Sequence, residues 1–239
     1  MRILYNNKLV DATITGTASA NFGLGNLLVP SLSIPFVATD QSVELTIVFD
    51  ALTSVTCIAF SGHNLENFKY RLYDGADVLT EEVLLVQLDP TETIYPTVHT
   101  AKKLVLNLYA PVGSIASMGY LSIGEYLQMP NPNAYYDEQI ILTNSREESV
   151  FGQVYGSDGV FLQTYAPDFS HVDLDKFNEV VNMLEQVRNF HPIFVDMTEF
   201  NHPYKKPLYA TVSGSEFVNK RDTRGYQRRS FALAIREVK

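Results

Sequence analysis

Residues 46–65 constrain the fold most, because they combine a half-buried strand, a fully apolar strand and a turn. Apolar side chains stand at every second position of the preceding and overlapping stretch 43–49, which is the period of a strand with one buried face. Residues 55–60 are apolar on both faces apart from Thr56, as in a strand inside a β-sandwich. Residues 61–64 have turn composition, with a glycine and an asparagine that can adopt positive φ.

These strands resemble a known family. Residues 43–49, residues 55–60 and the following Gly-His-Asn-Leu look like the galactose-binding-like, discoidin-type β-sandwich, and more narrowly like its version in tail proteins of bacteriophages and prophages. Residues 102–108 and 119–126 resemble the closing strands of that sandwich, in which a strand of the type Leu-Ser-Ile-Gly returns beside the first strand. The resemblance covers about residues 10–130 and implies a jelly-roll sandwich.

The chain of 239 residues is long enough for two domains that each bury a core. The sequence Pro-Asn-Pro-Asn at 130–133 predicts a boundary, so we expect a galactose-binding-like sandwich over 1–130 and a second domain over 131–239. Tyr and Phe, 14 each, favour strands. The strands predicted after the boundary are residues 139–144, 149–155, 160–165, 193–197, 207–212 and 229–236.

The second domain carries the one predicted helix, near 173–189. Ser170 with Asp173 predicts a capping box at its start, and Pro192 stops its continuation. The strand and helix order resembles the second half of bacteriophage tail-tip and distal-tail-like proteins over about residues 137–239. The predicted fold class is therefore mainly β, a sandwich followed by an α+β domain of antiparallel strands with one long helix. The apolar stripe expected to face the core is Leu174, Phe177, Val181 and Leu184, widened by Val180 and Val187.

Charge is unevenly distributed along the chain. The net charge is −9, but the residues from Asn201 onward carry +6, which leaves −15 for the first 200. Within the basic part, Arg221, Arg224, Arg228 and Arg229 form a cluster that we interpret as a subunit interface docking on an acidic neighbour. A solvated hairpin and nucleic-acid binding are the alternatives. We expect no nucleic acid as partner.

No motif for covalent chemistry or for a cofactor is present. The five His residues are scattered, and neither a P-loop nor Gly-x-Gly-x-x-Gly occurs. Glu81-Glu82 and Glu147-Glu148 are adjacent pairs, which would point to opposite faces of a strand rather than form the facing pair of a glycosidase. We therefore expect no enzyme, no cofactor and no metal, with a structural Ca²⁺ at Asp40, Asp74 and Asp77 as an open alternative.

The resemblance implies a structural protein of a bacteriophage tail tip or baseplate. Such a protein would self-assemble into a ring, trimer or hexamer and link the tail tube to tip or fibre proteins, so its place would be the virion, assembled in the host cytoplasm. No stretch reaches 18 apolar residues, so we expect no membrane insertion. The single Cys57 excludes an intrachain disulfide and is expected to be buried.

The alternative function is a carbohydrate-binding module that contacts host surface glycans through loops of the first domain. The side chains expected to contact the glycan are His63, Asn64 and Tyr95. The absence of Trp counts against a sugar-stacking platform.

Overall fold

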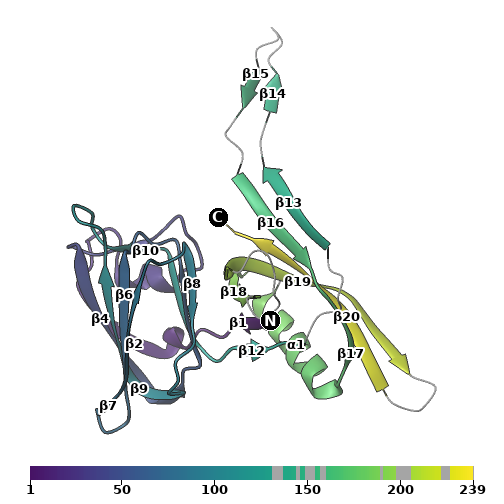
Figure 1. Cartoon of the computed structure of the whole chain (residues 1–239), viewed down its shortest axis with the longest axis horizontal. Coiled ribbons are helices and arrows are strands. Elements are labelled where there is room, and N and C mark those ends of the chain that lie inside the picture. The colour runs from purple at the N-terminus through teal and green to yellow at the C-terminus, as the bar shows by residue number, and fades with distance from the viewer. Residues whose placement is uncertain are drawn as a thin grey trace. The chain divides into compact units, whose positions relative to one another are not determined.

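The computed structural model describes residues 1–130, 137–143, 146–148, 154–156, 160–188, 191–197, 206–221 and 227–238. The chain divides into two compact units, Met1–Gln128 with Phe194–Leu208, and Met129–Ile193 with Tyr209–Lys239. The sequence prediction assigns everything after residue 130 to the second domain, whereas Phe194–Leu208 is counted here with the first unit. The described residues are mainly strand, with α1 as their one α-helix, which confirms the predicted fold class (Figure 1).

One layer of the first unit is an antiparallel sheet with the strand order β2-β4-β9-β6-β7. In β4, Val43, Leu45, Ile47 and Phe49 are buried and alternate with more exposed residues, as the period of the sequence predicts. The strands are β2 (Ala12–Thr15), β4 (Ser42–Ser54), β6 (Asn67–Tyr73), β7 (Leu79–Val86) and β9 (Thr100–Tyr109).

The facing layer has the order β11-β5-β8, and a further two-stranded sheet pairs β3 with β10. Every residue of β5 and β11 is buried, which agrees with the prediction of a strand apolar on both faces for residues 55–60. Phe60 of β5 stacks on Phe68 of β6 with ring centroids 4.5 Å apart, so the two layers share one core. The strands are β3 (Phe36–Val37), β5 (Cys57–Ser61), β8 (Thr91–Ile94), β10 (Ser117–Met118) and β11 (Tyr120–Gly124).

The first strand of the chain lies outside both sandwich sheets. β1 (Arg2–Leu4) pairs antiparallel with β12 (Leu127–Gln128) on one side and with β18 (Ile193–Asp196) on the other. Two short 3₁₀ helices, η1 (Lys8–Asp11) and η2 (Leu24–Leu28), precede and follow β2.

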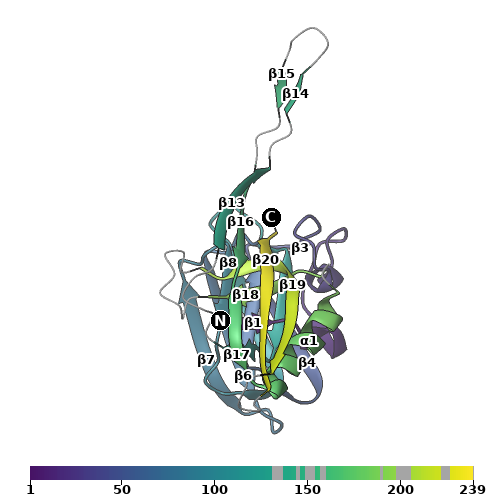
Figure 2. The same ribbon diagram turned by 90° about the vertical axis from the view of Figure 1, so that its right-hand side faces the viewer.

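Antiparallel strands also build the second unit: β19 pairs with β20, β20 with β16 and β17, and β16 with β13. β14 pairs with β15 in a register shifted by one residue from that of the β13–β16 hairpin, and Figure 2 shows this pair beyond the ends of β13 and β16. The strands are β13 (Asp137–Thr143), β14 (Arg146–Glu148), β15 (Val154–Gly156), β16 (Val160–Ala166), β17 (Asp168–Val172), β19 (Leu208–Arg221) and β20 (Gln227–Glu237).

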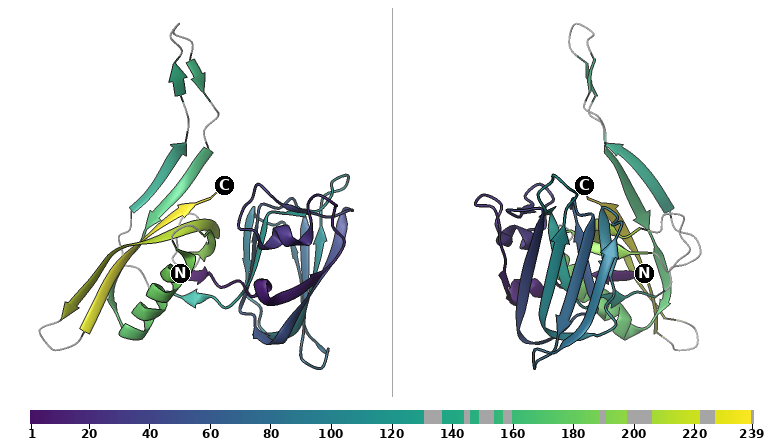
Figure 3. Two further views of the ribbon diagram at one scale, coloured as in Figure 1. Left: turned by 180° about the vertical axis from the view of Figure 1, so that it is seen from behind. Right: turned by 60° about the vertical axis from the view of Figure 1, so that its left-hand side comes forward.

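The helix α1 (Leu174–Val187) packs beside β20 (Figure 3). Its N-cap is Asp173 itself, whose side chain accepts a hydrogen bond from the Lys176 N–H, so the predicted capping box with Ser170 is wrong. The predicted apolar stripe is rotated, because Leu174 is exposed. The fully buried face consists of Phe177, Val180, Met183 and Val187.

Candidate functional site

One end of the sandwich gathers four of its loops. Ser42 pairs with Tyr109, and Asn67 pairs with both Tyr109 and Val86, so β4, β9, β6 and β7 all begin or finish there. The segments that connect them at this end are residues 16–41, 62–66, 87–90 and 110–119, and we call their exposed surface the loop end.

Asn64 ties two of these segments together. Its side-chain amide donates to the Ile115 carbonyl at 2.7 Å, and its Oδ1 accepts from the Ser117 N–H at 2.9 Å. A primary amide has two N–H groups and two acceptor lone pairs, and Asn64 is exposed. One donor and one acceptor site of a rigidly held amide therefore remain for a ligand.

The ring nitrogens of His63 form hydrogen bonds within the fold. Its Nδ1 accepts from the Leu65 N–H at 3.1 Å, so its Nε2 carries the proton and donates to the Asp89 carbonyl at 2.8 Å. Its ring packs edge-on against Phe60. Burial lowers the pKa of His63, and the hydrogen bond to Asp89 offsets only part of this effect. Both ring nitrogens are occupied within the fold.

Tyr95 lies far from the other two predicted glycan contacts along β8, since Thr91 pairs with Ser61 while Tyr95 follows the last residue of the strand. Its hydroxyl donates to Asp196 Oδ2 at 2.5 Å, and the Arg2 guanidinium lies over its ring, 4.2 Å from the centroid. Burial raises the pKa of Tyr95, and the neighbouring Cys57 and Asp196 add to the effect. Of the three predicted contacts, Asn64 alone has polar capacity at the loop end.

The loop end also carries exposed apolar side chains. Half of the Ile115 side chain is exposed. The Phe22 carbonyl accepts from the Val37 N–H, Val37 pairs with Ser117, and Ser117 is bonded to Asn64, so two segments lie between Phe22 and Asn64 at the loop end. Sequence reasoning missed Phe22 and Ile115, and their signal is an isolated large apolar residue within a Ser-, Gly- and Pro-rich loop. The exposed large apolar residues of the four loop-end segments are Phe22, Val29, Ile34, Val112 and Ile115.

A tight turn presents the most exposed of these side chains. The Ser114 N–H donates to the Pro111 carbonyl at 3.0 Å, and Gly113, the third residue of this turn, has a φ of +86°. This is the geometry of a type II turn with glycine at the position that requires positive φ. Val112 stands at the tip and is 90% exposed.

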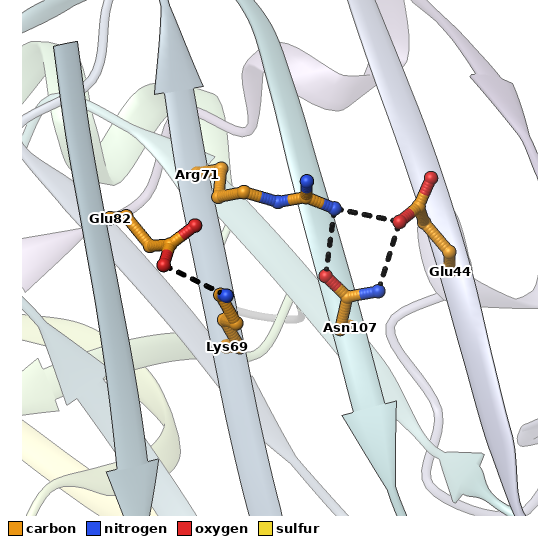
Figure 4. A network of polar contacts seen from close by, with 5 residues as sticks. All are labelled: Glu44, Lys69, Arg71, Glu82 and Asn107. Carbon is orange, nitrogen blue, oxygen red and sulfur yellow. Dashed lines mark hydrogen bonds and ion pairs between the residues drawn. The ribbon is translucent and has the colours of Figure 1, made fainter. Parts of the chain in front are cut away.

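The outer face of the five-stranded sheet carries a second set of polar contacts (Figure 4). Arg71 of β6 donates to Glu44 Oε2 at 2.7 Å and to Asn107 Oδ1 at 3.1 Å, and Asn107 donates back to Glu44 at 3.0 Å. Beside them, Lys69 pairs with Glu82 at 2.8 Å. Cross-strand pairs of this kind are typical of a solvated sheet face and contribute little stability each.

The predicted alternative of a Ca²⁺ site finds no support in the described residues. Asp40 precedes β4 at the loop end, whereas Asp74 follows β6 at the opposite end. Asp74 accepts hydrogen bonds from backbone N–H groups of its own turn, and Asp77 forms an ion pair with Lys103. Among the described residues, no three His, Cys, Asp or Glu side chains lie close enough together to hold a metal ion.

Glu81 and Glu82 point to opposite faces of β7, as the strand period predicts. Glu81 accepts from the Tyr70 hydroxyl at 2.6 Å and from Thr97 and Val98, while Glu82 lies on the outer face beside Lys69. Burial by itself would raise the pKa of Glu81, but these hydrogen bonds outweigh it and hold the pKa below its ordinary value. For Glu147-Glu148, the structure describes the backbone alone.

The basic cluster is described only in part. Arg221 and Arg228 belong to the paired end of β19 and β20, where the structure describes the backbone, and Arg224 lies outside the described residues. The Arg229 guanidinium lies over the Phe177 ring, 5.0 Å from its centroid, within the second unit. The role of this cluster as a subunit interface stays a prediction.

Within the described ranges, no helix combines the length and apolar character that a membrane span requires.

Comparison with known proteins gives similarity at the level of solved structures. No protein-family model matches the chain, and no curated protein sequence matches it. A chitosan-binding module from a chitosanase/glucanase of Paenibacillus sp. IK-5 covers 50% of this chain and 99% of its own, with 11% identity and a TM-score of 0.43. A fucose-binding module of Streptococcus pneumoniae covers 50% and 95%, with 11% identity and a TM-score of 0.44. The lectin domain of lectinolysin, in complex with Lewis B antigen, covers 49% and 95%, with 9% identity and a TM-score of 0.43.

These similar structures are carbohydrate-binding β-sandwich modules, in keeping with the galactose-binding-like resemblance of the first part of the sequence. At this identity and TM-score, they carry no argument about what this chain binds. Nothing in the comparisons supports a bacteriophage tail, which remains a prediction.

Proposed function

We propose that the first unit of this chain binds carbohydrate at its loop end, with Asn64 as the central polar contact. The observation that carries the proposal is the Asn64 amide, held by two backbone hydrogen bonds while one donor and one acceptor site remain exposed. A sugar hydroxyl both donates and accepts, so it matches such an amide. Ligand sites combine a few fixed polar groups with apolar surface, and Ile115 and Phe22 supply that surface for the C–H face of a sugar ring.

The charge of the chain narrows the ligand class. Residues 1–128 of the first unit contain six Lys/Arg and twelve Asp/Glu, a net charge of −6, and a negative protein field repels anionic ligands. We therefore expect neutral glycans, as on a host surface, rather than sulfated or uronic acid chains. The proposal involves no covalent chemistry.

The test is a titration of the whole chain with neutral oligosaccharides, first chosen on a glycan array and then measured by calorimetry. Ile115→Ala and Phe22→Ala should each weaken binding by about tenfold, because an apolar contact contributes about 1–1.5 kcal/mol. Val10→Ala is the matched control, since Val10 is exposed and lies in η1, next to β2 at the other end of the sandwich. Absence of neutral glycan binding, or equal losses in all three variants, would count against the proposal.

The second candidate function is that of a self-assembling structural protein, as in the tip or baseplate of a bacteriophage tail. The observation that favours it is the long β13–β16 hairpin with β14 and β15 at its far end. Within the described residues β14 and β15 pair only with each other, and an isolated two-stranded ribbon is marginally stable in water. Assembly with further copies or with other tail proteins would give this ribbon a partner.

A shortened hairpin tests the second candidate. Residues 144–159 are replaced by Asn-Gly, which favours a tight two-residue turn between β13 and β16. Light scattering at low and high salt should show an oligomer for the natural chain and a smaller species for the shortened one. The same number of copies per particle for the shortened and the natural chain would contradict a role of the hairpin in assembly.

A further inference from the structure

β7 is an open edge of the sandwich. It ends the order β2-β4-β9-β6-β7, and in the part of the chain that the structure describes β6 is the one strand that pairs with it. The backbone N–H and C=O groups along its other side are thus available for pairing with a further strand.

The apolar half of this edge lacks the usual protection. Natural edge strands carry lysine, proline or inward charges that prevent pairing with another chain. Residues 83–86 are Val-Leu-Leu-Val, and on the outer face Leu84 is 57% and Val86 60% exposed. The strand stops only at Gln87, which has a φ of +58°.

We infer that β7 pairs antiparallel with β7 of a second copy of this chain, across a twofold axis at Leu84. In this register Leu84 lies opposite its own copy on the outer face, and Val83 lies opposite Leu85 on the inner face. Both pairs set apolar against apolar side chains, which stabilises antiparallel strands. The two five-stranded sheets then become one continuous sheet.

The register follows from the side chains along the strand. Directly opposed residues of an antiparallel pair share a face. The twofold axis must therefore run between one residue and the same residue of the second copy. An axis at Glu82 would set two carboxylates face to face, which is unfavourable. The axis at Leu84 instead places Glu82 opposite Val86, and Lys69 remains in contact with Glu82.

A second copy fits this edge better than a foreign peptide, because a twofold contact is self-complementary. Each edge supplies the same apolar half to the other, so both exposed patches are covered at once. A single extended peptide would cover one edge, and its own side chains would have to reproduce this pattern.

The test compares two leucines of equal exposure on the same sheet. Leu84→Lys should weaken dimerisation by about tenfold or more, since it removes an apolar contact and opposes two ammonium groups at the axis. Leu52→Lys is the control, because Leu52 of β4 is 59% exposed and lies outside the proposed contact. The dimer dissociation constant is measured for both by sedimentation of the full chain.

An engineered cysteine tests the register itself. Leu84→Cys should form a disulfide-linked dimer under mild oxidation, because opposed Cβ atoms across the axis lie within disulfide reach. The natural Cys57 is buried, and burial raises its pKa, so it stays out of this reaction. A monomer at all concentrations, equal effects of both lysine variants, or cross-linking of Leu84→Cys no faster than that of Leu52→Cys would each overturn the inference.

Discussion

Replacing Tyr95 by Phe should destabilise the first unit by about 2 kcal/mol. The variant keeps the ring under the Arg2 guanidinium but removes the hydroxyl that donates to Asp196 at 2.5 Å. Asp196 is only 3% exposed, so water cannot replace the lost donor. A hydrogen bond to a charged group contributes about 1.5–3 kcal/mol, which sets the size of the effect.

The matched control is Tyr126→Phe. The Tyr126 ring packs against Tyr95 and also lies beneath Arg2, so the control removes a hydroxyl from the same aromatic cluster. No hydrogen bond to the Tyr126 hydroxyl exists among the described residues, and its loss should cost at most about 0.5 kcal/mol. Urea unfolding followed by circular dichroism measures the free energy of unfolding of both variants. In thermal unfolding, the Tyr95→Phe variant should melt about 4–8 °C below the natural chain.

A double-mutant cycle decides whether the loss belongs to this hydrogen bond. Tyr95→Phe, Asp196→Asn and the double variant should give a coupling free energy of about 1–2 kcal/mol. Equal losses for Tyr95→Phe and Tyr126→Phe, or a coupling near zero, would refute the reasoning. Since Tyr95 acts within the fold, the affinity of folded Tyr95→Phe for any glycan should equal that of the natural chain.

Three further predictions concern pH and the helix. Burial lowers the pKa of His63, so the unfolded chain binds a proton more readily than the folded one, and stability should fall as the pH drops below about 6.5. His63→Gln should reduce this fall, measured as urea midpoints from pH 7 to pH 5. Hydrogen bonds from Thr97 and others lower the pKa of Glu81, so the ionised Glu81 stabilises the folded state above about pH 4.3, and this contribution is lost on acidification. Glu81→Gln should therefore unfold at a lower urea concentration than the natural chain at pH 7 but not at pH 3. Asp173→Ala removes the acceptor of the Lys176 N–H and should cost about 1 kcal/mol in thermal unfolding, and no change would contradict its role as N-cap.

The strands of the sandwich could be predicted because the burial of one or both faces of a strand determines the spacing of apolar residues along the sequence. The alternation in residues 43–49 and the apolar run 55–60 became β4 and β5 with the expected faces. The helix could be predicted too, but not which of its faces is buried. Leu174 belongs to the first turn of α1 and is exposed, whereas Met183 is buried, because neighbouring strands decide which of two overlapping apolar stripes is covered.

The site could be predicted only where local sequence determines it. Asn64 can be predicted as a ligand contact because the turn composition of its segment places its amide in a loop. Nothing local indicates that Tyr95 meets Asp196, since that contact joins residues of distant segments. Whether an isolated Phe22 or Ile115 in a polar loop is buried or exposed likewise depends on the packing of the other loops.

The pairing of β1 has a consequence for the order in which the chain can fold during synthesis. Residues 2–4 leave the ribosome about 190 residues before one of their two neighbouring strands, at 194–196. Until then one side of β1 lacks its backbone partner, and Tyr95 lacks Asp196. The sandwich sheets need no residue beyond Gly124, so they can form before β18 is made, whereas the pairing of β1 with β18 must follow it. A chain interrupted near residue 130 would therefore carry a complete sandwich with its first strand only half paired.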